Sequence, residues 1–151
     1  MKATIWRGTG IAGTLAAVAV GLWIAGGPQQ SNRVDITQGR ELYGQYCASC
    51  HGANLEGQPD WRTPLPSGRF PAPPHDETGH TWHHADGILF EIVKFGSAAV
   101  VGGDYESDMP AFNDVLTDEQ IAAVLEFIRS TWPDRERAYQ REQSVSRSDL
   151  D

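Results

Sequence analysis

The stretch Cys47-Ala48-Ser49-Cys50-His51 contains both cysteines of the 151-residue chain, separated by two residues and followed directly by a histidine. This spacing is typical of a site where haem is attached covalently. The two thiols add across the haem vinyl groups, and the adjacent imidazole binds the iron from one side. A structural disulfide would close a loop too short to remove much chain entropy. The stretch therefore predicts one c-type haem on Cys47 and Cys50, with His51 as an iron ligand.

The composition is that of an ordinary globular protein, with 40% hydrophobic and 21% charged residues. A chain of this length has room for one domain and a tail. The formal net charge is -8, and residues 28–151 contain 10 basic and 20 acidic side chains. An acidic surface repels nucleic acid and favours basic patches on protein partners. The sequence therefore argues against nucleic-acid binding.

The N-terminus carries two basic residues, Lys2 and Arg7, ahead of an apolar run over residues 11–25. This pattern is typical of an export signal sequence and equally of an N-terminal membrane anchor. The run is near the lower length limit for a transmembrane helix. Length therefore does not distinguish a signal from an anchor, whereas the cleavage site does.

Neither cleavage site in this segment is favourable. Ala17-Val18-Ala19 lies inside the apolar run, and the small residues at 25–27 are followed at once by Pro28. We therefore predict an uncleaved anchor at residues 1–27, with a removed signal and a soluble periplasmic protein as the alternative, and a linker at 28–34. In both cases the domain is exported to the periplasmic side of the cytoplasmic membrane.

Three helices are expected from capping signals and apolar periodicity. The first begins near Asp35 or Thr37 and leads into Cys47, the second covers residues 86–96 with Asp86 as N-cap, and the third covers residues 117–132. The third opens on the capping box Thr117-Asp118-Glu119-Gln120 and stops at Trp132-Pro133. Residues 134–151 are charged and polar, and we expect a tail with at most a turn or two of solvated helix.

The run G-R-E-L-Y-G-Q-Y-C-A-S-C-H-G at residues 39–52 resembles the opening of a class I mono-haem cytochrome c, and the resemblance extends over about residues 37–133. It implies an all-α, cytochrome c-like fold over residues 35–133, with three to four short helices and long loops wrapped around one haem. In that family the N-terminal helix crosses the C-terminal helix through a small residue and an aromatic. Here Gly39, Tyr43 and Phe127 would form that crossing.

Residues 52–85 hold six of the nine prolines and show no periodicity, so they predict a long loop. A haem can supply the apolar surface that such a loop needs. The resemblance implies that a backbone carbonyl in this loop accepts a hydrogen bond from His51; we expect Pro73, with Pro64 as the alternative. Three polar side chains in this loop suit hydrogen bonds to the haem propionates: Arg62, Arg69 and Trp82. The alternative for the two arginines is a solvated position on the surface.

Four histidines in the same loop have three interpretations: His75, His80, His83 and His84. They can be loop residues with packing or propionate contacts, one of them can be the distal iron ligand, or they can form a separate copper or zinc site. His80 and His84 have H-x3-H spacing and could join Cys47 and Cys50 on zinc. The 29 residues between Cys50 and His80 far exceed the usual zinc-finger spacing, which weakens that interpretation.

Met109 is the only methionine besides Met1, and it lies in a loop immediately before Pro110. The alternative role is that of a side chain filling a gap in the core. The run M-P-A-F at residues 109–112 resembles the distal-ligand segment of the same family, which implies that the Met109 thioether is the second iron ligand.

With His51 and Met109 both bound, the iron has no open position, which favours electron transfer over catalysis. We therefore predict a single-electron carrier that passes electrons between redox partners, and no enzyme. The alternatives are a copper-handling or sensing haem protein that uses residues 75–84, a haem enzyme with a labile distal ligand, and a C-x-x-C oxidoreductase. The last leaves His51 without a role and lacks a βαβ pattern.

Overall fold

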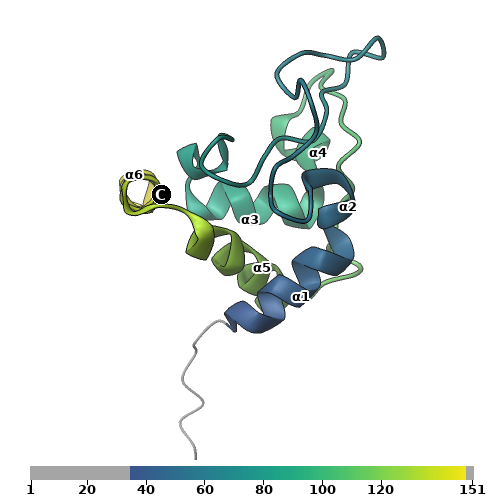
Figure 1. Ribbon diagram of the computed structural model, residues 1–151. Helices are drawn as coiled ribbons and strands as arrows, with labels where there is room; N and C mark the ends of the chain where they lie inside the picture. Colours follow the sequence, from purple (N-terminus) through teal and green to yellow (C-terminus); the bar gives the residue numbers. More distant parts are fainter. Residues whose placement is uncertain (1–34, 149–151) are drawn as a thin grey trace, which may run out of the picture. The chain divides into compact units, whose positions relative to one another are not determined.

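The computed structural model describes residues 35–148, and these residues form helices and loops without a strand. The elements in chain order are α1 (Ile36–Tyr46), α2 (Ala48–His51), the 3-10 turn η1 (Thr81–His83), α3 (Asp86–Phe95), α4 (Ser97–Val101), α5 (Asp118–Thr131) and α6 (Asp134–Ser148) (Figure 1). The all-α prediction is confirmed. Three to four short helices are expected over residues 35–133, and this range contains five α-helices, one of which is the four-residue α2; α6 lies beyond it.

Helices α1 and α5 cross and form the most extensive contact between helices in the described residues (Figure 1). The carboxylate of Asp35 accepts hydrogen bonds from the backbone N–H groups of Thr37 and Gln38 and so caps α1. Gly39 lies so close to α5 that a Cβ atom there would be 2.0 Å from the carbonyl oxygen of Ala123. The predicted contact through a small residue is therefore present.

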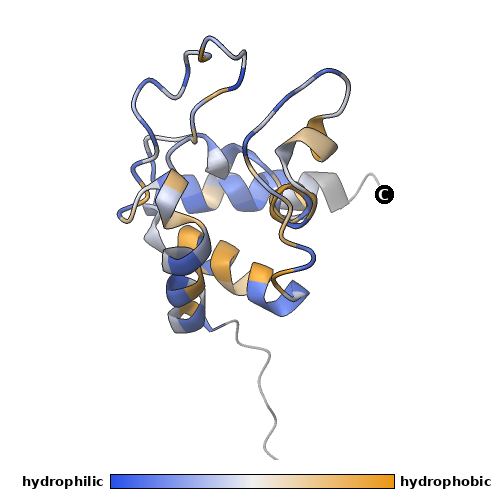
Figure 2. Ribbon diagram, turned by 90° about the vertical axis from the view of Figure 1, so that its right-hand side faces the viewer, coloured by the Kyte–Doolittle hydropathy of each residue, from blue (hydrophilic) through white to orange (hydrophobic). Residues whose placement is uncertain are grey.

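Aromatic and aliphatic side chains complete this crossing. The Tyr43 and Phe127 rings pack with centroids 5.4 Å apart. The buried face of α5 consists of Ile121, Ala123, Val124, Leu125, Phe127 and Ile128. Hydrophobic residues are concentrated on α5 and α3, whereas α6 and the long loops are mostly hydrophilic (Figure 2). Burial of this apolar face is the main driving force for assembling the helices.

Helix α5 begins at the capping box and ends next to Trp132-Pro133, as the sequence predicts. The Thr117 hydroxyl accepts from the Gln120 N–H, and the Gln120 side chain accepts from the Thr117 N–H, which completes the capping box. The helix ends at Thr131, one residue before the buried Trp132. The indole N–H of Trp132 then donates to the backbone carbonyl of His75, 2.7 Å away. The end of α5 is thereby tied to the long loop.

The start of α3 differs from the expectation that Asp86 is its N-cap. The N-cap is Ala85, and the Asp86 side chain accepts from Gln140 and pairs with Arg129 instead. The backbone N–H of Asp86 is satisfied by the Ser144 hydroxyl, 3.0 Å away on α6. A residue of a distant helix thus takes the role that a local cap usually has.

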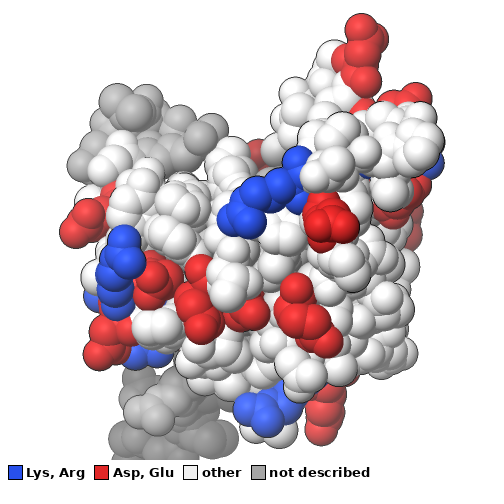
Figure 3. Space-filling model, turned by 45° about the horizontal axis from the view of Figure 1, so that its top comes forward, with Lys and Arg blue, Asp and Glu red and all other residues white. Residues whose placement is uncertain are grey.

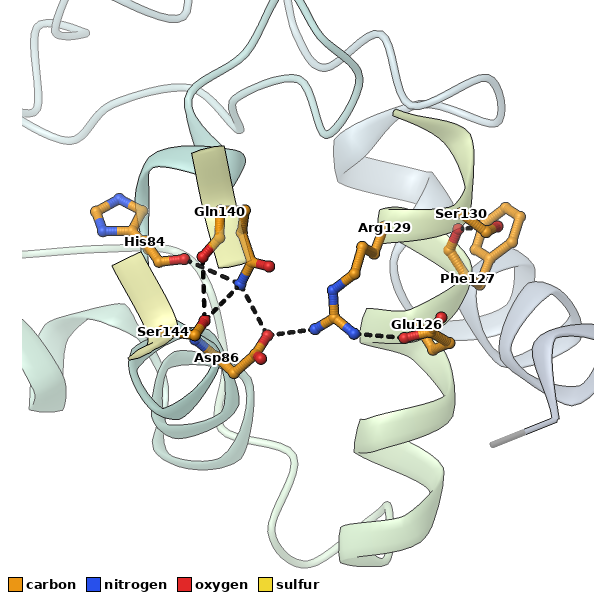
Figure 4. Close-up of polar contacts among 8 residues, drawn as sticks. All are labelled: His84, Asp86, Glu126, Phe127, Arg129, Ser130, Gln140 and Ser144. Carbon is orange, nitrogen blue, oxygen red and sulfur yellow. Dashed lines mark hydrogen bonds and ion pairs between the residues drawn. The ribbon is translucent and has the colours of Figure 1, made fainter. Parts of the chain in front are cut away.

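The expectation of a polar tail beyond residue 133 is wrong for residues 134–148, which form the 15-residue helix α6. Gln140 on α6 is fully buried, and its amide donates to the His84 carbonyl, the Asp86 carboxylate and the Ser144 hydroxyl. Figure 4 shows this network continuing from Asp86 to Arg129 on α5. A buried amide with several polar partners explains why a helix of low hydropathy packs on the domain.

The loop between α2 and η1 is held by its own backbone contacts. Gln58 and Ala72 exchange two hydrogen bonds, one through the Gln58 side chain. Gly57, at φ 69°, leaves no room for a Cβ, which would lie 2.4 Å from the Pro74 nitrogen. The loop therefore folds back on itself and brings residues 72–75 against the segment that follows α2.

The anchor or signal predicted at residues 1–27 and the linker at 28–34 lie outside the described residues. Across residues 35–148, no helix is both long enough and apolar enough to cross a membrane.

Candidate haem site

His51 is the last residue of α2, and its side chain is buried, with 7% relative exposure. Its Nδ1 lies 2.8 Å from the carbonyl oxygen of Pro73, the contact that was expected. A carbonyl oxygen only accepts, so Nδ1 carries the proton and Nε2 keeps its lone pair. Burial lowers the pKa of His51, against a smaller opposite effect of the Pro73 bond. The imidazole is therefore kept in the neutral form that binds a metal.

The backbone around His51 is fixed from two sides. The N–H of Gly57 donates to the His51 carbonyl at 2.8 Å. The Tyr43 hydroxyl donates toward the carbonyls of Gly52, at 3.1 Å, and His51, at 3.4 Å. Because Tyr43 also packs on Phe127 of α5, the same side chain stabilises both the helix crossing and the backbone around His51.

Cys47 and Cys50 are free thiols one helical turn apart, with the N–H of Cys50 donating to the Cys47 carbonyl at 3.1 Å. Cys47 is half-buried and Cys50 is exposed. Burial, and then the neighbouring Cys50, raise the pKa of Cys47 to about 11. Thiol–disulfide oxidoreductases need a lowered thiol pKa, so this environment disfavours the C-x-x-C oxidoreductase hypothesis.

Met109 is half-buried, and three contacts hold it. The Ser97 hydroxyl donates to its sulfur at 3.1 Å, and its backbone N–H donates to the Ser107 hydroxyl at 3.1 Å. Its carbonyl oxygen lies against Gly96, where a Cβ would be 3.2 Å from that oxygen. A side chain that merely fills a core gap does not need a hydrogen bond to its sulfur.

His75 lies against His51. The two imidazole rings stack with centroids 3.9 Å apart and an interplanar angle of 17°. Burial lowers the pKa of His75 well below its ordinary value, and the nearby His51 and His80 add to that effect. His75 is therefore neutral, and its ring packs against the His51 imidazole.

The other three histidines lie among aromatic rings. His80 stacks on Trp61 and His83 stacks on Trp82, while the rings of His80 and His84 meet edge to face. Within residues 35–148, no group of three or more His, Cys, Asp or Glu side chains converges as metal ligands. The described residues therefore give no support to a separate copper or zinc site, which was one of the three interpretations of His75, His80, His83 and His84.

The three side chains expected near the haem propionates have protein partners. Arg69 pairs with Glu106 and Asp108, which lie on the loop of Met109. The indole N–H of Trp82 donates to the Glu77 carbonyl at 3.3 Å. The guanidinium of Arg62 lies 4.0 Å from the Trp61 ring centroid and donates to the Thr78 carbonyl. Their contact with propionates stays a prediction.

A model of the cytochrome c family matches residues 36–132, which is more than half of the chain. The chain belongs to the cytochrome c family. Membership implies a covalently bound haem c and haem-based electron transfer for this cytochrome. No curated protein and no solved structure matches it. The matched range ends at the end of α5, so α6 lies beyond it.

The donor set of this cytochrome fits a covalent haem. Cys47 and Cys50 are free thiols that would add to the two vinyl groups, and His51 presents the lone pair of Nε2. Sequence reasoning missed Ser97 and the contact of Trp132 with the His75 carbonyl. A serine after a helix-ending glycine is ordinary, and no pattern in a single chain links Trp132 to a loop far from it.

Proposed function

We propose that this cytochrome is a single-electron carrier whose haem iron is bound by His51 and Met109. The observation that carries the proposal is the hydrogen bond from His51 Nδ1 to the Pro73 carbonyl. Because Nδ1 is occupied by this bond, Nε2 is the only ring nitrogen with a lone pair that can bind the iron. When bound, the haem supplies an iron that changes charge by one electron. The protein contributes ligands that keep the same positions in both charge states.

The chain's own residues minimise movement at the site. His51 is oriented by Pro73, and its backbone is held by Gly57. Met109 is held at its nitrogen and its sulfur by Ser107 and Ser97. With ligands held in this way, little has to rearrange when an electron arrives, and no position is left for a substrate. Both features favour electron transfer over catalysis.

The partners that we propose are redox proteins with basic surface patches. The chain is acidic, with 20 Asp and Glu against 12 Lys and Arg residues. Acidic side chains are spread over the face in Figure 3, and basic side chains lie among them without forming one basic patch. Complementary charge speeds the encounter of two redox proteins and makes the rate depend on salt. Such an encounter suits brief electron transfer.

We also propose that the domain works on the periplasmic side of the cytoplasmic membrane, tethered by residues 1–27. The basic residues Lys2 and Arg7 ahead of an apolar run support this location. Fractionation of cells that make the full chain should place haem-stained protein in the membrane fraction. Recovery in the soluble periplasm with a shortened N-terminus would instead indicate a removed signal.

The ligands can be tested by absorption spectroscopy of the full chain made with a haem-attachment system. We expect covalent haem and, in the ferric protein, the weak red charge-transfer band of methionine ligation. Met109→Ala should lose this band and keep the covalent haem. A variant of His80, His83 and His84, each changed to Gln, serves as the control and should keep the band. A wild-type protein without the band would overturn Met109 as ligand.

The same preparation distinguishes an electron carrier from a haem enzyme. A haem with an open position binds cyanide or carbon monoxide quickly, whereas an iron with two protein ligands binds them slowly. We expect slow binding in the wild type and fast binding in Met109→Ala. Fast binding by the wild type would favour a catalytic haem with a labile distal ligand.

A further inference from the structure

The imidazole of His75 lies face to face with that of His51, at a centroid distance of 3.9 Å and an interplanar angle of 17°. The proposed function uses the edge of His51: Nδ1 donates to Pro73, and Nε2 binds the iron. It assigns nothing to the face of that ring. The stacked His75 covers that face.

The bond to Pro73 restrains the His51 ring at one edge only. In an imidazole, the line from Nε2 through the ring centre crosses the Nδ1–Cγ bond, and the Nδ1–H bond points to one side of that line. A hydrogen bond at Nδ1 therefore restrains rotation about that line through a single contact. A flat group pressed against the ring face resists this rotation directly, since turning the ring would drive its edge into the neighbour.

His75 is held firmly enough to act as such a group. Its backbone N–H donates to the Leu55 carbonyl at 2.8 Å, and its carbonyl accepts from the Trp132 indole at 2.7 Å. The ring of Tyr43 meets the His75 ring edge to face, with centroids 5.8 Å apart. The backbone N–H and carbonyl of His75 and its ring are thus held by contacts with buried residues.

The buried Nδ1 of His75 has no hydrogen-bond partner among the described residues. An orphaned polar atom of this kind destabilises the folded state, and a leucine would not carry that cost. The imidazole at this position is therefore not explained by stability. A flat ring of the same size and shape as its neighbour is explained by stacking.

We propose that His75 is a positioning residue for the proximal ligand, and that its stacked ring fixes the rotation of the His51 imidazole about its bond to the iron. This inference rests on the proposed binding of His51 to haem iron, and it does not depend on Met109. Pro73 and His75 then hold His51 together, one at the ring edge and the other at the ring face.

Proton NMR of the ferric holoprotein tests the proposal, because the order and spread of the haem-methyl resonances follow the orientation of the axial imidazole plane. His75→Leu removes the flat ring, and we expect a changed order or a changed spread. His75→Phe keeps a flat ring and should preserve the wild-type pattern. His83→Leu, a histidine of the same loop that stacks on Trp82 at the surface, is the matched control and should also preserve it.

A leucine variant with the wild-type pattern would overturn the proposal, as would a phenylalanine variant that shifts the pattern as much as leucine does. If His75→Leu does not take up haem, His75→Gln keeps a polar side chain without a ring and should show the changed pattern. Failure of the proposed function would appear differently, as a wild-type protein without covalent low-spin haem.

Discussion

Substitution of Gly39 by alanine should weaken the crossing of α1 and α5. A Cβ atom at this position would lie 2.0 Å from the Ala123 carbonyl oxygen, 2.6 Å from the carbonyl carbon and 3.0 Å from the Phe127 Cβ. The nearest atoms belong to the backbone of α5, so the two helices must move apart to relieve the overlap. That movement would also separate the Tyr43 and Phe127 rings, now 5.4 Å apart.

Two effects determine how much Gly39→Ala changes the free energy of unfolding. Alanine is the better helix former by about 1 kcal/mol. Overpacking costs roughly 1–3 kcal/mol, and an overlap with backbone belongs near the upper end, about 3 kcal/mol. The net loss in the free energy of unfolding is therefore about 2 kcal/mol, which corresponds to a fall in Tm of about 10 °C for a domain of this size.

Gly44 provides a matched control, because it lies on the same helix and a Cβ there would meet nothing within 4 Å. Gly44→Ala should raise the free energy of unfolding by up to about 1 kcal/mol through helix propensity alone. Thermal unfolding of both holoprotein variants, followed by far-ultraviolet circular dichroism, compares the two positions. If Gly39→Ala matches or exceeds the wild-type Tm, the close approach of the two backbones is refuted.

Three further predictions concern the caps, α6 and pH. Thr117→Ala should lower the free energy of unfolding by about 1 kcal/mol in denaturant titrations, and Thr117→Ser should restore most of it, since both hydroxyl residues cap the helix. Gln140→Ala removes the three hydrogen bonds that the fully buried amide donates and should cost about 1–3 kcal/mol. The exposed Arg141→Ala should change stability by less than about 0.5 kcal/mol, and equal effects of the two substitutions would argue that α6 does not pack as described. Burial, followed by neighbouring imidazoles, lowers the pKa values of His80 and His84 below 6.5, so the unfolded state takes up protons before the folded state does. Stability should therefore be complete above pH 6.5 and fall as the pH drops below it, and Tm measured across this range should fall less in the His80→Gln, His84→Gln double variant.

Local signals in the sequence account for much of the fold. The capping box at Thr117 and the N-cap at Asp35 are contacts between residues two or three positions apart, so the sequence contains both partners. Gly39 is informative because a glycine within a helix needs a reason, and close packing is a common one. The sequence predicts Asp86 as the N-cap of α3, one residue later than the observed N-cap Ala85, because the Asp86 N–H is satisfied by Ser144 from a distant helix.

The polar helix α6 shows what hydropathy misses. Its residues are charged and polar, and the segment alone predicts a solvated tail. It packs because Gln140 finds three acceptors on segments that are 4 to 56 residues away in the chain. A buried side chain whose burial depends on hydrogen bonds leaves no apolar periodicity to detect.

The sequence by itself determined which chemical groups the candidate site offers: two thiols, a following imidazole and one methionine besides Met1. Residue type and spacing alone define that set. Only the tertiary structure decided how the loop between α2 and η1 surrounds it. A proline-rich segment without periodicity does not encode which of its residues return to His51. The fold brings Pro73 to the edge of that imidazole and His75 to its face, and it pairs Arg69 with the loop of Met109. These contacts join residues distant in the chain, and their geometry follows from packing.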